Sequence, residues 1–191
     1  MLDFFENAGD DGVIVFSFGT ILKPEEMPAE TIVEIVETFK KLKQRVLWKV
    51  DHTKLGIDIL PPNVLTRVWI PQQKVLAHPK VVLFICHGGV LGVQEAIYHA
   101  VPILAIPIFN DQHKIAKKIE SYGIGFFLRI EDLSRETFTA AIEKITTDSA
   151  LKKNISEASA FFKDNAIDPM KKAMYWIEHT VRNNAARNQN P

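Results

Sequence analysis

Residues 81–92 have the sequence VVLFICHGGVLG, and this stretch decides the fold. Its first six residues are apolar and long enough for one β-strand covered on both faces, as strands of parallel sheets are. Gly88 and Gly89 then turn the chain, and helically spaced apolar residues follow from Val93. A buried strand that passes through glycines into a helix is the repeating unit of α/β proteins.

The same alternation continues on both sides of this stretch. Further strands are predicted at residues 13–18, 46–48, 65–69, 103–106 and 126–128. Apolar spacing, a first-turn proline and Ser or Asp caps predict helices over residues 28–42, 93–100, 111–122, 134–146, 149–162 and 169–183. The pattern predicts an α/β, Rossmann-like doubly wound parallel sheet of about six strands with right-handed crossovers, formed by one domain over residues 1–191.

Composition excludes several classes of function. Hydrophobic residues make up 47% and charged residues 24%, and 23 basic residues balance 23 acidic ones, so there is no electrostatic basis for binding nucleic acid. The single cysteine, Cys86, excludes a disulfide framework, and the 6 histidines lack metal-ligand spacing, so neither a metal nor another cofactor is expected. No signal peptide or apolar run of roughly 20 residues is present. Both ends read as cuts made in a longer protein.

Ligands of open parallel sheets bind beyond the carboxyl ends of the strands, and the turn after residue 86 is the first candidate. Free N–H groups at a helix start, reached closely because Gly88 and Gly89 lack side chains, bind anions such as phosphate. His87 lies beside this turn, and Glu95 in the helix can accept both hydroxyls of a ribose. The alternative is a helix start that merely needs small residues, with His87 a hydrogen-bonded loop residue.

The second candidate is Trp69-Ile70-Pro71-Gln72, after the strand at residues 65–69. A tryptophan before a rigid turn can stack on a flat base, a contact worth about 1–3 kcal/mol. The Ile70 backbone and the Gln72 amide can then read the edge of a uracil. The pattern alone favours the alternative, in which Trp69 is a core residue beneath the next helix.

Two further strand ends carry polar residues. Asp111 and Gln112 suit the neighbouring hydroxyls of a sugar, although Asp111 is also a natural helix cap, the favoured interpretation in isolation. Ser17-Phe18-Gly19-Thr20 could close over a diphosphate or form a plain turn. Dinucleotide-binding G-x-G-x-x-G, P-loop and nucleophile-elbow motifs are all missing, so the sequence predicts nucleotide binding without a resident nucleophile.

Taken in order, these elements resemble the donor-binding signature of the UDP-glycosyltransferase family, which includes UDP-glucuronosyltransferases. The resemblance is carried by Trp69-x-Pro71-Gln72, Leu76-x-His78-Pro79, His87-Gly88-Gly89-x-x-Gly92-x-x-Glu95-Ala96, Pro102, Pro107 and Asp111-Gln112. The loop at residues 17–20 and the closing helices are also similar, so the resemblance covers nearly the whole chain. The run from residue 87 to residue 112 is most similar to arthropod members.

The resemblance implies the C-terminal half of a GT-B glycosyltransferase that binds UDP-glucose or UDP-glucuronate. It implies stacking of Trp69 on uracil, contacts to base and ribose by Ile70, Gln72 and Glu95, a diphosphate cradle, and contacts to the sugar by Asp111 and Gln112. The cradle consists of Ser17, Gly19, Thr20, His87, Gly88, Gly89 and Gly92. Cys86 and Leu91 depart from the family, which often has threonine and asparagine or histidine there, so two polar phosphate contacts are missing.

The family's catalytic base is a histidine of the N-terminal acceptor domain, which this chain lacks, so no catalytic residue is expected here. The resemblance implies transfer of a hexose, with inversion, to small lipophilic acceptors in detoxification. It also implies a C-terminal membrane anchor outside this chain and a lumenal position at the endoplasmic reticulum. The isolated chain, which could form a homo-oligomer, is expected to bind UDP-sugar without turnover. A soluble donor-binding subunit and a non-catalytic nucleotide-binding module are the alternatives.

Overall fold

Six parallel strands form the sheet, and their order is β3-β2-β1-β4-β5-β6. The computed structural model describes residues 2–20, 22–57, 59–164 and 167–187. The strands are β1 (Val13–Ser17), β2 (Arg45–Lys49), β3 (Val64–Arg67), β4 (Val81–Cys86), β5 (Ile103–Ala105) and β6 (Gly125–Phe127). This strand order is that of dinucleotide-binding Rossmann folds, which confirms the predicted fold class.

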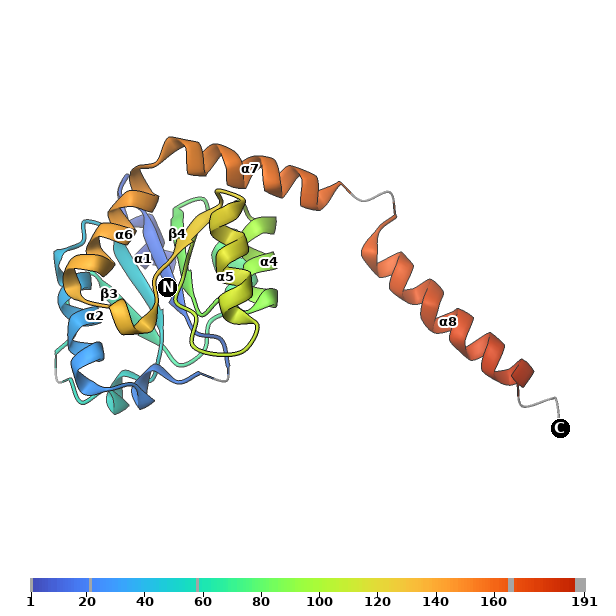
Figure 1. The fold of residues 1–191 in the computed structure, drawn as a ribbon, viewed down its shortest axis with the longest axis horizontal. Helices are drawn as coiled ribbons and strands as arrows, with labels where there is room; N and C mark the ends of the chain where they lie inside the picture. Colours follow the sequence, from blue (N-terminus) through green and yellow to red (C-terminus); the bar gives the residue numbers. More distant parts are fainter. Residues whose placement is uncertain (1, 21, 58, 165–166, 188–191) are drawn as a thin grey trace.

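Helices cover both faces of the sheet (Figure 1). The helices are α1 (Leu2–Glu6), α2 (Ala29–Lys41), α3 (Gln72–Leu76), α4 (Val90–Tyr98), α5 (Gln112–Ser121), α6 (Arg135–Thr147), α7 (Ser149–Lys163) and α8 (Pro169–Arg187). Short 3-10 turns occur at Pro24–Glu26, His52–Lys54 and Ile130–Asp132. Buried residues of α2 and α6 pack on one face, and those of α1, α3, α4 and α5 pack on the other.

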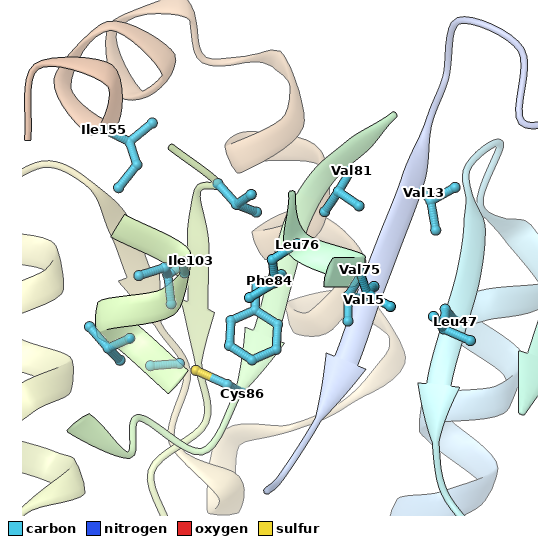
Figure 2. Close-up of a cluster of buried hydrophobic side chains, with 14 of the residues drawn as sticks. Val13, Val15, Leu47, Val75, Leu76, Val81, Phe84, Cys86, Ile103 and Ile155 are labelled. Carbon is cyan, nitrogen blue, oxygen red and sulfur yellow. The ribbon is translucent and has the colours of Figure 1, made fainter. Parts of the chain in front are cut away.

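Strand β4 shows why its sequence is continuously apolar. Phe84 and Cys86 point to the face that α3 and α4 cover, where Figure 2 shows them in one cluster with Leu76. Leu83 and Ile85 belong to the cluster on the opposite face. Because helices cover both faces, a polar side chain would be buried at every position of the strand except Val82, which is partly exposed.

Several predicted boundaries shift by a few residues. Strand β3 ends at Arg67, two residues before its predicted end, and Ala100 lies beyond α4 with a φ of 56°. Helices α1 and α3 were not predicted, because five residues are too few to show a period. Ile21, in the loop after β1, and the polar residues 188–191 lie outside the described residues.

The predicted helix signals hold at three positions. Ser134 caps α6 through a capping box with Thr137, and Asp168 accepts the Lys171 N–H at 3.0 Å at the start of α8. Gly123 ends α5 with a φ of 62°. The Gly123 carbonyl accepts a hydrogen bond of 3.1 Å from Asn154 of α7, which ties these two helices together.

Helix α8 extends away from the rest of the molecule (Figure 1). Met170, Met174, Ile177 and Val181 follow one another at helical spacing and are all exposed. Among the described helices, none combines the length and apolarity that crossing a bilayer requires.

Candidate functional site

A cavity of about 790 Å³ opens at the carboxyl edge of the sheet, between the loops that follow β1, β3, β4 and β5. Chain connections leave β1 and β4 in opposite directions, so this is the switch point where ligands bind in such sheets. The volume lies within the range of small-molecule sites, about 300–1,000 Å³.

The cavity brings together almost all of the predicted site residues. Those that line it are Ser17, Gly19, Thr20, Trp69, Ile70, Gln72, His87, Gly89, Gly92, Glu95, Asp111 and Gln112. The exception is Gly88, whose φ of 81° turns the chain and whose α-carbon faces the Gln112 carbonyl. Trp69 and Glu95 therefore face one space, as a shared nucleotide site requires. That these residues bind a donor remains a prediction.

The His87 imidazole is wedged between two glycines. A β-carbon added at Gly19 would lie 3.0 Å from His87 Cε1, and one added at Gly89 would overlap Nε2. His87 Nδ1 is buried and has no hydrogen-bond partner among the described residues. Nδ1 therefore lacks the hydrogen bond that the alternative, a merely hydrogen-bonded loop histidine, would require.

Burial lowers the pKa of His87, and the Asp111 carboxylate partly offsets this effect. The ring is consequently neutral at pH 7 and carries one N–H donor. Cys86, next to it, is fully buried, and burial raises the pKa of its thiol to about 12. A neutral thiol at that depth is no nucleophile at physiological pH.

The start of α4 is free to receive an anion. Gly89 occupies the cap position without a side chain, and the first turn of α4 contains no acidic residue. Across the cavity, Ser17 Oγ accepts the Gly19 N–H at 3.3 Å and so shapes the loop after β1. Partial positive charge at the helix start and a glycine turn on either side favour a phosphate group here.

At the other end of the cavity, Trp69 is exposed, whereas Gln72 and Glu95 are partly buried. Trp69 is 69% exposed, so the interpretation as a core tryptophan is wrong. Gln72 Nε2 donates to Glu95 Oε2 at 2.6 Å, which links the turn after β3 to α4. The Ile70 side chain is buried, which leaves its backbone to contact a ligand.

Asp111 and Gln112, at the end of the loop that follows β5, form another part of the cavity wall. Asp111 precedes α5, but its side chain makes no capping hydrogen bond, because its backbone is already helical with a ψ of −16°. Asp111 therefore occupies the cap position without capping through its side chain, and its carboxylate stays exposed in the cavity wall. Gln112 Oε1 accepts the N–H groups of Ile108 and Phe109 at 2.9 and 3.1 Å, which fixes the loop.

Sequence reasoning missed Lys49, the last residue of β2, which also lines the cavity. The one signal for it in the sequence is its place directly after the predicted strand at residues 46–48. Val90, Leu91 and Phe109 add an exposed apolar rim. Within the ranges described, no group of three or more His, Cys, Asp or Glu is placed to hold a metal ion.

The family described as UDP-glucoronosyl and UDP-glucosyl transferase matches residues 1–190. The chain belongs to this family. It is 38% identical over 188 residues to the UDP-glycosyltransferase UGT5 of Dactylopius coccus and 33% identical over 187 residues to the human UDP-glucuronosyltransferase 2B17. These alignments cover 97% and 98% of the chain but only 35% and 34% of those relatives. The chain thus spans about a third of the length of the UDP-glycosyltransferases it matches.

Solved glycosyltransferase structures share the fold. The glycotransferase of kitacinnamycin superposes with a TM-score of 0.72 at 26% identity, over 81% of this chain and 40% of that one. Os79 from O. sativa in complex with UDP gives a TM-score of 0.74 at 24% identity, over 83% of this chain and 37% of that one. The sheet and its helices are therefore one Rossmann-like half of the GT-B architecture.

Proposed function

We propose that this chain is the donor-binding half of a UDP-glycosyltransferase and that its cavity holds the UDP moiety of a UDP-sugar. One observation carries the proposal: Trp69, the glycine-bounded His87 turn and Glu95 line the same cavity at the switch point of the sheet. The indole suits the base of a nucleotide, the carboxylate suits its ribose, and the glycine turn at the helix start suits its diphosphate. The family and the UDP in the Os79 structure support this assignment.

Each end of the nucleotide has a partner of suited chemistry. Uracil would stack on Trp69, and the ribose hydroxyls would donate to Glu95, which Gln72 holds in place. The diphosphate would accept from the backbone at the start of α4 and from the neutral His87. Asp111 and Gln112 would contact the sugar beyond the second phosphate.

The proposed reaction is direct displacement at the anomeric carbon with inversion. A base outside this chain would deprotonate the acceptor hydroxyl, whose oxygen would attack the anomeric carbon as its bond to UDP breaks. The electron pair leaves with UDP, and the α4 N-terminus and His87 would stabilise the charge that develops on the phosphate oxygen. The reaction requires no metal, and the acceptor would be a small lipophilic alcohol or phenol.

The whole enzyme would include the N-terminal acceptor lobe that supplies the base, since the chain spans only about a third of its relatives. We infer that this enzyme is anchored at the endoplasmic reticulum membrane with its lobes in the lumen. The chain alone would bind UDP-glucose or UDP-glucuronate without turning them over. Competition between these two donors for binding would identify the hexose.

Calorimetric titration of the folded chain with UDP tests the proposal. Wild type should bind, and Glu95→Ala should weaken binding at least tenfold, because a hydrogen bond to a charged group contributes about 1.5–3 kcal/mol. Glu157→Ala is the matched control, an exposed glutamate on α7 that pairs with Lys153 and does not line the cavity. A folded wild type that does not bind UDP would refute the proposal. Sugar transfer to a phenol by the chain alone would refute its inactivity.

A further inference from the structure

Lys49 connects the two ends of the cavity. It ends β2, which lies between β1 and β3, so its side chain emerges between the loop after β1 and the turn after β3. Its ammonium group donates a hydrogen bond to the Gly19 carbonyl. The same nitrogen lies 5.1 Å from the centroid of the Trp69 ring, within the range of a cation–π contact.

Among the described residues, the Lys49 ammonium group directly contacts a carbonyl and an indole, both neutral. None of the ion pairs found among the described residues involves it, although Lys54, five residues later, pairs with Asp51 at 3.3 Å. Partial burial lowers the pKa of the Lys49 ammonium, an effect that the Glu25 carboxylate only partly offsets. A carbonyl and an indole face compensate a desolvated cation less well than an anion does. Lys49 is therefore a cation within a cavity whose proposed ligand is an anion.

We propose that Lys49 is a movable link that couples recognition of the diphosphate to recognition of the base. Without ligand, the ammonium group rests on the Trp69 indole and the Gly19 carbonyl. A diphosphate at the loop after β1 and the start of α4 draws the ammonium group toward itself, which frees the indole for the base. Uridine has no phosphate to attract the Lys49 ammonium group, so its base has to compete with that group for the Trp69 indole. The inference rests on the proposed function and adds a positioning residue to it.

Affinity for two ligands separates this role from a structural one. UDP and uridine should be titrated into wild type, Lys49→Met and Lys49→Arg, each checked for folding by thermal unfolding. Lys49→Met should weaken UDP about tenfold or more, because it removes one charge-assisted hydrogen bond. It should leave uridine binding unchanged or slightly tighter, because uridine no longer has to displace the cation–π contact between Lys49 and Trp69. Lys49→Arg keeps the charge and should retain most of the UDP affinity.

Lys54→Met is the matched control, since it removes the same charge from an exposed position outside the cavity. It should change neither affinity. If Lys49→Met weakens UDP and uridine by the same factor, the lysine only supports the local structure and the inference is wrong. If UDP affinity does not change, the ammonium group does not meet the diphosphate, and the inference is again wrong. A wild type that binds no UDP overturns the proposed function itself, and the coupling with it.

Discussion

The two ends of the cavity are built in opposite ways. At the end proposed to hold the diphosphate, here called the phosphate end, backbone turns and the His87 imidazole define the surface, and Gly19, His87 and Gly89 fit against one another. At the end proposed to hold the base, here called the base end, side chains define it: Trp69 is 69% exposed and contacts Lys49. Substitutions at the phosphate end should therefore affect both folding and binding, whereas those at the base end should affect binding alone.

The largest effect is expected for Gly89→Ala. The added methyl group would overlap the His87 ring, which would have to shift from its place next to Gly19. Overpacking of this kind costs about 1–3 kcal/mol of unfolding free energy, and the displaced ring should also lower UDP affinity at least tenfold. Denaturant unfolding and calorimetry measure the two quantities. Unchanged values of both would mean that the phosphate end is not preformed.

Trp69→Ala should have a smaller effect, confined to binding. Loss of base stacking costs about 1–3 kcal/mol, which is roughly fivefold to 150-fold in UDP affinity. The unfolding free energy should change by no more than about 0.5 kcal/mol, because the side chain is exposed. Trp176→Ala in α8 is the matched control, since Trp176 is 54% exposed and lies outside the cavity. Equal effects of the two substitutions on UDP binding would contradict stacking on Trp69.

Glu95→Gln should reduce the preference of the cavity for UDP over 2′-deoxy-UDP. The wild-type carboxylate accepts from hydroxyls, so UDP should bind several-fold more tightly than its 2′-deoxy analogue. The neutral amide should reduce this preference, while Gln72 and residue 95 remain close enough to contact each other. Titrations with both nucleotides measure the ratio. A preference that survives the substitution would place the ribose elsewhere.

The smallest effect is expected for Asp111→Asn, which should change the pKa of His87. Since the Asp111 carboxylate raises the pKa of His87 against the lowering by burial, Asp111→Asn should lower that pKa further. An ionised ring attracts a diphosphate, so the affinity for UDP-glucose should rise as the pH falls through the pKa of His87, and in Asp111→Asn this rise should begin at a lower pH. NMR titration of the ring and calorimetry at several pH values test both statements. If the pKa of His87 rises in Asp111→Asn, the substitution changes the burial of the ring more than it changes the nearby charge.

The pH dependence of stability has a definite sign at this residue. The pKa of His87 is lower in the folded chain than its ordinary value of 6.5, so the unfolded chain binds the proton more readily. The contribution of the neutral ring to stability is complete above pH 6.5 and is lost as the pH falls through the lowered pKa.

The strand, turn and helix start that form the phosphate end could be predicted from sequence because their signals are local. An apolar strand, paired glycines and a helix start follow one another over residues 81–92. The exposure of Trp69 could not be predicted, since it depends on what packs above it. Helix α3 has only five residues, and it buries Val75 and Leu76 in the core instead of covering the indole.

Two other features depend on long-range order. Lys49 meets Gly19 and Trp69, which are 30 and 20 residues away along the chain, only because β2 lies between β1 and β3. The sequence does not state that order. For Asp111 the sequence favours a side-chain cap over a ligand-facing carboxylate, and the helical backbone ψ at that one residue is not visible in the sequence.

Helix α8 carries an exposed row of Met170, Met174, Ile177 and Val181, and every described side chain from residue 169 to residue 184 except His179 is exposed. Most helical stability in proteins comes from packing of an apolar face, and the exposed side chains of α8 contribute little of it. Its amide hydrogens should therefore exchange with deuterium far sooner than those of the sheet. Trypsin should cut first at its lysines and arginines, and the cavity at the carboxyl edge of the sheet should remain intact after this truncation.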